Sequence, residues 1–509
     1  MSTFMSTLMS SLLNTTGLWM LLALGILIVS TGLPVWALLI GVATAFSAIG
    51  LITGAIDVNL LTAAPTRIVG LLEHDLLQAL PLYVLVGMLL QRLAVADAIF
   101  NTLARALRFT GAGVPLAALG TGALLAPMNG SVASSSALLS RVIAPRLQGL
   151  VHIGPAKSTA LVAAAATIGV VVPPSLVLLL LGDAMLRAHL EAGNLPGANL
   201  AGQRIVNTQD ILSAALLPAC AMLLLWAVWL LVAYRQPSNS FKTPISEEKT
   251  PETSVQYAQA AIAFIAIAII LALLGAVFTG AMFAVEAAAT GCCLLIVITL
   301  LTRSLSLQDW RSVVQDTLAL TGSLVALLVA ATMFSLVFRG FGTDKWLANA
   351  LLTSGWSPML TAAVILAVVA LCACVLDAFE MIFVIIPVVA PPLIASLGDA
   401  SQAAVLLLLL LQLSFVLPPM GYAVLMARAH AAKSGQSLPI SLIFRQIMPF
   451  AAVVIAQAAI VFIAPSFVHQ LDKPGQRTDS GTASEVDIVR QMEDMAKQEP
   501  AAEPASSKP

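Results

Sequence analysis

Several long stretches of this chain carry no charged residue, and one of them is interrupted in its middle by two adjacent prolines. The run from 158 to 182 extends for 25 residues and reads STALVAAAATIGVVVPPSLVLLLLG. A helix needs about 20 apolar residues to cross the hydrocarbon core of a bilayer. Only 10% of the 509 residues are charged, whereas a soluble chain has roughly a quarter. The sequence therefore predicts an all-α polytopic membrane protein.

The N-terminal region predicts how the chain sits in the membrane. No lysine or arginine precedes Arg67, so the basic segment that begins a cleaved secretory signal is missing and the first helices should be retained. Because basic residues favour the cytoplasmic side, we expect the N-terminus to face the periplasm across a bacterial inner membrane. The net charge of −1 gives no reason to expect a nucleic-acid partner, and the expected surroundings are the lipid bilayer.

The interrupted run has a counterpart late in the chain. The sequence FVLPPMGYAVL (415–425) lies in a second uncharged run, from 400 to 427. A polar interruption precedes each pair of prolines: NGSVASSS (129–136) before the first and LDAFE (376–380) before the second. Pro173 follows Ser131 by 42 positions, and Pro418 follows Asp377 by 41. Repeated units with discontinuous helices are typical of secondary transporters, so we expect a duplicated chain.

This duplication predicts the organisation of the chain. We expect N-terminal scaffold helices over 1–56, a first repeat over 57–234, a polar linker over 235–256, a second repeat over 257–468 and a disordered polar tail over 469–509. Each repeat should contain a re-entrant hairpin (near 115–140 and near 359–397) and a broken helix (158–182 and 400–427). Splitting 115–140 at Gly130 leaves legs too short to cross a bilayer. The block 359–397 could also be two crossings, but the repeat favours a hairpin whose turn is buried by protein.

The prolines predict where polar chemistry occurs. A proline has no N–H, so carbonyl oxygens are left free near 169–172 and near 414–417. Na⁺ is one candidate partner, and the helix that restarts after each break presents a positive N-terminal end to an anion. Plain kinks patched by serine, threonine or water are the alternative. The candidate oxygens near the breaks belong to Ser131, Ser134, Ser135, Ser136, Thr167, Ser175, Asp377, Gln412 and Ser414.

The acidic residues within the apolar blocks allow two interpretations. A carboxylate inside a membrane segment is costly and usually functional, which favours a role for Asp377 and Glu380. Their three-residue spacing also fits a helix capping box, in which both would be structural. Glu286 begins a span and is interpreted as interfacial. The tripeptide RAH follows each broken helix, at 187–189 and at 428–430, where we expect it to anchor the membrane edge.

No catalytic or nucleotide-binding pattern is present in the sequence. The chain has no phosphate-binding loop with its lysine, no paired nucleophile and base, and no zinc-ligand spacing. We therefore expect neither an enzyme nor an organic cofactor.

Six motifs resemble a known family when they are taken in order and at their spacings. They are PLYVLVGMLL (81–90), NGSVASSS (129–136), ATIGVVVPPSLVLLLLGDAM (166–185), EAAATG (286–291), LDAFEMIFVIIPVVAP (376–391) and LPPMGYAVLMARA (417–429). Over residues 17–468 the chain is similar to the large membrane (M) subunit of tripartite ATP-independent periplasmic (TRAP) transporters.

The resemblance implies an inverted-repeat, elevator-type fold and a Na⁺-coupled importer of small organic acids. It also implies two protein partners: a small four-helix membrane subunit, expected here as a separate chain, and a periplasmic substrate-binding protein. A stand-alone dicarboxylate/sodium symporter of a related elevator fold is the alternative. A membrane-embedded enzyme or a channel is disfavoured by the residue pattern.

The family pattern also implies the sites. It places Na⁺ between each hairpin tip and the following break, at Gly130, Ser131, Gly169, Val172 and Pro173, and at Asp377, Leu417, Pro418 and Met420. We expect the substrate to contact Asn129, Ser134, Ser175, Asp377, Glu380 and Gly421. The first hairpin has one serine fewer than is common in the family.

Overall fold

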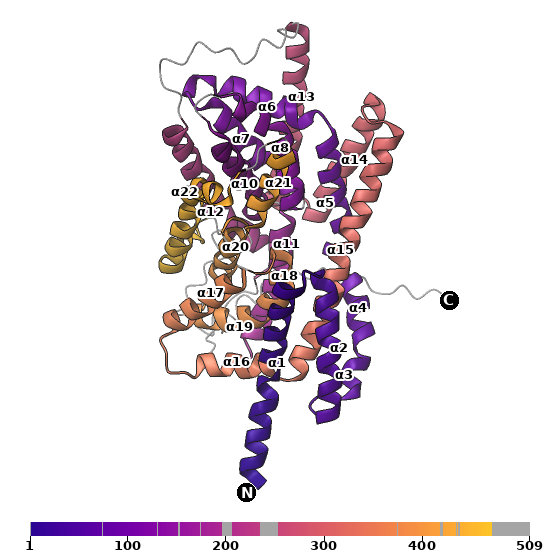
Figure 1. Ribbon diagram of the computed structural model, residues 1–509, viewed down its shortest axis with the longest axis vertical. Helices are drawn as coiled ribbons and strands as arrows, with labels where there is room; N and C mark the ends of the chain where they lie inside the picture. The colour runs from indigo at the N-terminus through magenta and orange to yellow at the C-terminus, as the bar shows by residue number, and fades with distance from the viewer. Residues whose placement is uncertain are drawn as a thin grey trace, which may run out of the picture.

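The computed structural model describes residues 2–73, 75–129, 131–150, 153–173, 175–195, 206–234, 253–373, 375–417, 421–433, 435 and 438–470. Over these residues the chain consists of helices and their connections, without a strand (Figure 1). Eight of the described helices or helix pairs are long and apolar enough to cross a membrane, and a bent pair would make nine. The predicted all-α polytopic membrane fold is confirmed.

Two groups of helices from different halves of the chain pack against each other. The first group consists of α1 (Ser2–Thr31), α2 (Val35–Thr53), α3 (Val58–Thr62), α4 (Ala64–Leu72) and α5 (Asp75–Arg92). The second consists of α13 (Thr253–Thr279), α14 (Ala284–Thr302) and α15 (Leu307–Gly340). Helix α2 packs along α15, and α14 packs along α5. We call these two groups together the scaffold.

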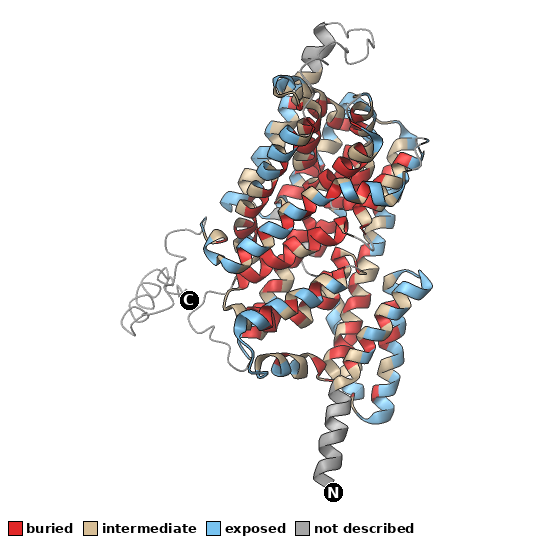
Figure 2. Ribbon diagram, turned by 60° about the vertical axis from the view of Figure 1, so that its left-hand side comes forward, coloured by how far each residue is buried: buried red, intermediate tan, exposed pale blue. Residues whose placement is uncertain are grey.

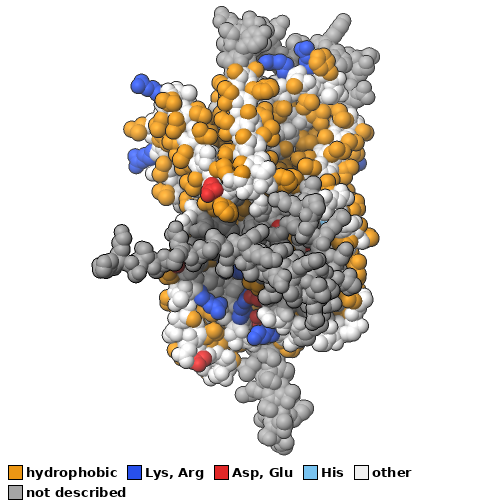
Figure 3. Space-filling view, turned by 180° about the vertical axis from the view of Figure 1, so that it is seen from behind, with side chains coloured by type: hydrophobic (Ala, Val, Ile, Leu, Met, Phe, Trp, Pro, Cys, Tyr) orange, Lys and Arg blue, Asp and Glu red, His pale blue; other side chains and the backbone are white. Residues whose placement is uncertain are grey.

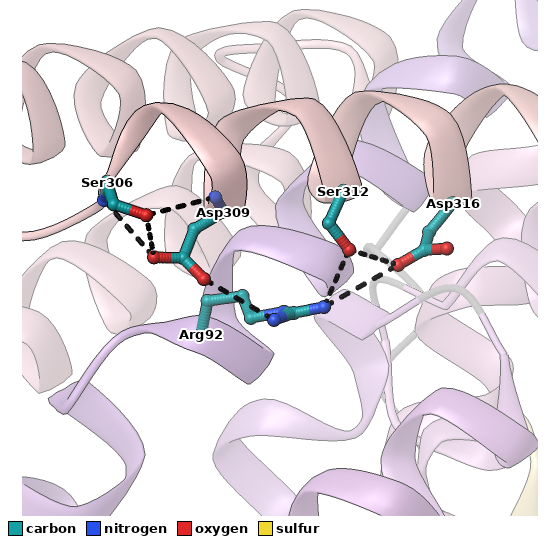
Figure 4. A network of polar contacts seen from close by, with 5 residues as sticks. All are labelled: Arg92, Ser306, Asp309, Ser312 and Asp316. Carbon is teal, nitrogen blue, oxygen red and sulfur yellow. Dashed lines mark hydrogen bonds and ion pairs between the residues drawn. The ribbon is translucent and has the colours of Figure 1, made fainter.

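An ion-pair network joins the two halves of the scaffold where α5 ends and α15 begins (Figure 4). The Arg92 guanidinium donates to Ser312 Oγ at 2.8 Å and lies 3.6 Å from Asp309 and 3.7 Å from Asp316. Asp309 also accepts from the backbone N–H and hydroxyl of Ser306, which caps α15. The network is partly exposed, so we expect it to fix geometry more than to add stability.

Each half of the chain contains a helix pair at the position predicted for a re-entrant hairpin, although the second leg of the later pair, Ala378–Leu397, has 20 residues and is long enough to cross a membrane. The first follows α6 (Val95–Ala106) and η1 (Arg108–Thr110), and comprises α7 (Gly113–Leu125), η2 (Pro127–Asn129), α8 (Val132–Val142) and α9 (Ala144–Gln148). The second follows α16 (Thr343–Leu352), and comprises α17 (Pro358–Ala373), α18 (Ala378–Glu380), the π-helical segment η4 (Met381–Ile385) and α19 (Ile386–Leu397). Helices α7 and α8 have 13 and 11 residues. At about 1.5 Å per residue, neither is long enough to cross a bilayer.

Two broken helices occupy the centre of the molecule. The first is α10 (Pro155–Val171) followed by α11 (Leu176–Ala192), and the second is α20 (Ala400–Val416) followed by α21 (Tyr422–Lys433). Helix α10 packs against α20, while α8 packs on α21 and α19 packs on α11. Most of α10 and all but one residue of α20 are buried, as expected for helices enclosed by protein. Buried residues gather along the middle of the molecule (Figure 2).

The helices α12 (Thr208–Ala233) and α22 (Ile440–Ile463), with η5 (Pro465–Phe467), pack around the broken helices. The Trp226 indole of α12 donates to the Phe450 carbonyl of α22 at 3.2 Å. Gln402 of α20 donates to the Val461 carbonyl at 2.9 Å. We call α7–α12 and α17–α22 together the core unit, because the two broken helices hold it together.

The outer surface is apolar, as expected for contact with lipid. Large hydrophobic side chains are exposed on α2, α12, α13 and α14, and hydrophobic atoms cover much of the face in Figure 3. Most of the predicted linker and all but two residues of the predicted tail lie outside the described residues. Helix α13 begins at Thr253, inside the range predicted as linker. The reciprocal packing of the two halves is the arrangement expected of a duplicated chain.

Candidate functional site

The first helix break is held by one serine side chain. Helix α10 ends at Val171, Val172 continues in an extended conformation, and Ser175 caps the start of α11. The Ser175 hydroxyl donates to the Val170 carbonyl at 3.2 Å and accepts from the backbone N–H of Leu178 at 3.3 Å. This hydroxyl replaces a donor that proline removes, which is the patching expected of a plain kink at that carbonyl. The Gly169 carbonyl also loses its usual partner, since Pro173 stands four residues later.

The tip of the first hairpin lies directly against this break. A Cβ atom added to Gly169 would collide with the carbonyl of Ala126, the residue that follows α7. The Ala126 carbonyl also accepts a long hydrogen bond, at 3.4 Å, from the hydroxyl of Ser135 on α8. A glycine is therefore required at 169 for the backbone of the hairpin to approach the broken helix so closely.

A small cavity separates the hairpin tip from the break. Its volume is about 10 Å³, and its lining includes Ser131, Ser135, Gly169 and Ser175. Ser131 stands at the N-cap of α8 in an extended conformation, and its side chain makes no capping hydrogen bond. The space is that of about one water molecule or small ion. Hydroxyl oxygens and carbonyls around such a space are the ligands that a hard cation takes.

The second break requires a glycine of its own. Helix α20 ends at Val416, and Leu417 is extended at its C-cap. Gly421 then adopts φ +45° before α21 begins, a left-handed conformation that side chains disfavour. A Cβ atom at this position would also lie 3.0 Å from the Phe444 ring. The intervening Pro418 and Met420, both predicted Na⁺ ligands, lie outside the described residues.

Asp377 and Glu380 form a capping box at the tip of the second hairpin. The Asp377 carboxylate accepts from the N–H of Ala378 at 2.7 Å, and Glu380 accepts from the N–H of Asp377 at 3.0 Å. The structural interpretation of this spacing therefore holds. A capping role does not exclude a second role for Asp377, because this carboxylate stands at the hairpin tip beside α20. Asp377 is also close enough to Tyr422, the first residue of α21, to interact with it electrostatically.

The helix after this capping box is irregular. The π-helical segment Met381–Ile385 follows Glu380 directly, and such segments often mark functional sites. The Phe383 carbonyl in this segment accepts a hydrogen bond, at 3.4 Å, from the hydroxyl of Ser335 on α15. The scaffold thus touches the second hairpin next to its tip. Ser335 had no distinguishing signal in the sequence, because its role depends on a contact between distant segments.

Two buried oxygens in the helices of the candidate site have no hydrogen-bond partner among the described residues. They are Oγ of Ser136 in α8 and Oε1 of Gln412 in α20. Both belong to the candidate oxygens predicted from the sequence. Buried polar atoms are nearly always paired, so an unpaired one is consistent with a bound water or ion.

The predicted site residues divide into three groups. Ser131, Gly169 and Ser175 line one cavity, with Val172 and Pro173 in the adjoining break. Asp377 and Glu380 share the second tip, and Leu417 and Gly421 flank the second break. Ser134 is buried in α8 away from the cavity lining, and Asn129 ends η2. Gly130 lies outside the described residues. The Ala126 carbonyl was not predicted, because a backbone oxygen has no signal in the sequence.

Most of the chain matches a known transporter family. Residues 20–467 match the family described as "Tripartite ATP-independent periplasmic transporter, DctM component". The chain belongs to this family. The DctM family consists of permease subunits and is not enzymatic, so the chain is a multi-pass transport subunit of a TRAP transporter.

Individual relatives are distant but extend over most of the chain. The sialic acid TRAP transporter large permease protein SiaM of Vibrio cholerae is 21% identical over 86% of this chain and 94% of its own length. The sialic acid TRAP transporter permease protein SiaT of Haemophilus influenzae is 21% identical over 90% of this chain and 68% of its own. The crystal structure of the Alcanivorax borkumensis YdaH transporter has a TM-score of 0.53 and 15% identity, covering 87% of this chain and 98% of that one. The last likeness concerns the fold alone.

The two hydrogen bonds of Ser175 predict how the first break responds to substitution. Ser175→Ala leaves the Val170 carbonyl and the Leu178 N–H without this partner, which should lower stability by about 1–3 kcal/mol. Ser175→Thr keeps a hydroxyl and should retain most of the wild-type stability. Thermal unfolding of the purified full chain measures both. The control is Ser213→Ala, since the Ser213 hydroxyl donates within a helix to the Gln209 carbonyl and should matter little. Equal effects of Ser175→Ala and Ser213→Ala would contradict the assignment.

Proposed function

We propose that this chain is the large permease subunit of a Na⁺-coupled importer of a small organic acid, working by an elevator motion. A periplasmic binding protein would deliver the acid, and a small four-helix membrane subunit would complete the complex. The observation that carries the proposal is the pairing of each helix break with the tip of a hairpin or short-helix pair at the centre of a TRAP permease fold.

The geometry of the first break supports Na⁺ as the coupling ion. Unwound backbone carbonyls in discontinuous helices are the usual Na⁺ ligands of secondary transporters. Here Ser131, Gly169 and Ser175 surround a space for one small ion. The second break has the corresponding parts: Asp377 at the hairpin tip and an extended Leu417.

The restarted helices support an anionic substrate. Helices α11 and α21 both begin at a break, so their N-terminal ends carry partial positive charge within the core unit. Such ends are suited to a carboxylate. Two of the relatives are named as sialic acid permeases, and sialic acid is an organic acid. We expect a carboxylate here as well, with Ser134, Asn129 and Glu380 among its contacts.

The contacts between the scaffold and the core unit support relative motion. Arg339 of α15 forms a two-pronged ion pair with Glu191 of α11, with Nη2 3.2 Å from Oε2. Ser335 adds the hydrogen bond to the second hairpin. Polar contacts of this kind can break and re-form as the core unit moves relative to the scaffold. An elevator motion would slide the core unit along α5 and α15.

The charge distribution supports an inner-membrane orientation with the N-terminus in the periplasm. The ends of α8 and α21 and the start of α10 lie together at one end of the core unit, where their residues line a common cavity. Those segments and the neighbouring helix ends carry Arg105, Arg108, Arg141, Arg146, Lys157, Lys433 and Arg445. Basic residues favour the cytoplasmic side, so this end should face the cytoplasm.

A stand-alone dicarboxylate/sodium symporter is the second candidate. It would use the same broken helices and would need no binding protein. The family match favours the tripartite assembly, since the family itself is described as tripartite.

Reconstituted uptake distinguishes these candidates. Proteoliposomes containing this chain, the small subunit and the cognate binding protein should accumulate an organic acid only with an inward Na⁺ gradient. Omitting either partner should abolish uptake. Uptake by this chain alone would favour the stand-alone symporter, and uptake unaffected by Na⁺ would reject the coupling.

The two capping carboxylates provide a matched test of Asp377. Glu286, the third residue of α14, accepts from the N–H of the N-cap residue Phe283 at 2.9 Å, whereas Asp377 is itself the N-cap residue at the second tip. If Asp377 also binds Na⁺ or substrate, Asp377→Ala should reduce uptake at least about tenfold, an interaction of about 1.4 kcal/mol. Glu286→Ala should reduce it far less. Uptake is measured against the amount of folded protein in the membrane. Equal and mild losses of uptake in the two variants would indicate that Asp377 has a purely structural role.

A further inference from the structure

A second cavity lies at the other end of the first hairpin, away from both breaks. Its volume is about 200 Å³, and it opens between α8, α9, the start of α10 and the end of α21. The first half of the chain thus supplies three of its walls and the second half the fourth. It is separate from the small cavity at the hairpin tip, with which it shares no lining residue.

The ionisable groups that line this cavity are all basic. Arg141 extends from the last turn of α8, and His430 and Lys433 extend from the last turns of α21. No acidic residue occurs among the described residues of the lining. The nearest paired carboxylate is Asp97 of α6, which lies 3.9 Å from Arg141 and is also bound, at 3.0 Å, by Arg146. The cavity therefore keeps an excess of positive charge.

Capping of helix C-termini does not account for this convergence. Basic side chains in a last turn interact favourably with the negative end of that helix, which explains each residue singly. It does not explain why basic residues from two separate helices line one cavity. Thr159, in the second turn of α10, adds a polar wall from a third direction.

The remaining walls indicate the kind of anion. Ser140, Gln148 and Thr159 provide polar groups, while alanine, valine and proline side chains form an apolar side. An arginine fork with a lysine is well suited to phosphate oxygens. Basic pockets between transmembrane helices on the cytoplasmic side commonly hold phosphate-bearing head groups. The volume admits a phosphate with a small attached group.

We propose that this cavity binds a phosphate-bearing anion, either the head group of an anionic phospholipid or a free phosphate compound. The bound phosphate would contact Arg141 and Lys433, with His430 beside them. It would join the first hairpin to α21 and so stabilise the packing of the two halves of the core unit. This inference does not depend on the proposed coupling ion or substrate.

Thermal stability in nanodiscs of defined composition tests the proposal. A ligand that binds only the folded state raises the unfolding temperature as its concentration rises. The full chain is placed in discs of phosphatidylcholine alone, of phosphatidylcholine with phosphatidylglycerol, and of phosphatidylcholine with inorganic phosphate in the buffer. Stabilisation by phosphatidylglycerol alone identifies a lipid head group, and stabilisation by inorganic phosphate identifies a free phosphate compound.

Matched variants assign any stabilisation to the cavity. Arg141→Gln with Lys433→Gln should remove at least half of the shift, whereas Arg445→Gln should keep it. Arg445 is an exposed cation near the start of α22 and does not line the cavity. Lys433→Gln alone should remove part of the shift. Because the Lys433 side chain is exposed, this single variant should fold and can be measured even if the double variant does not fold. The proposal is overturned if neither additive stabilises the wild type, or if the double variant keeps the whole shift.

Discussion

Unpaired backbone groups cannot be left facing lipid, and this constraint organises the whole molecule. A break in a membrane helix frees N–H and carbonyl groups that cost several kcal/mol each in hydrocarbon. The protein encloses both breaks: α10 and α20 lie at its centre with almost every residue buried. The scaffold, the hairpins and the flanking helices can therefore be understood as layers that keep lipid away from two stretches of irregular backbone.

The two halves of the chain build this enclosure by exchanging partners. Helix α8 of the first half packs on α21 of the second, and α19 of the second packs on α11 of the first. Each hairpin therefore packs on the broken helix of the opposite half, while its tip lies beside the break in the broken helix of its own half. The exchange explains why the halves do not form separate domains. It also explains why the cavity with Arg141 and Lys433 lies between them.

Local signals in the sequence predicted much of this structure, and long-range contacts were not predictable. Helix α10 ends at Val171 and α20 at Val416, each two residues before a proline, which has no N–H to donate to the carbonyl one turn earlier. The capping box of Asp377 and Glu380 follows from their spacing. The approach of Gly169 to Ala126 and the pairing of Arg339 with Glu191 join distant segments. Packing brings such pairs together, and no single stretch of sequence carries their signal.

The proposed elevator motion moves the core unit past the scaffold as it carries substrate. The ion pair between Arg339 on α15 and Glu191 on α11 joins the scaffold to the core unit. Locking this contact therefore tests the motion most directly. Cysteines are placed at 191 and 339 in a chain without its native cysteines, and a reducible bifunctional thiol reagent links them. Linking should stop uptake in proteoliposomes, and reduction should restore it. Full uptake by the linked protein would contradict an elevator motion between these helices.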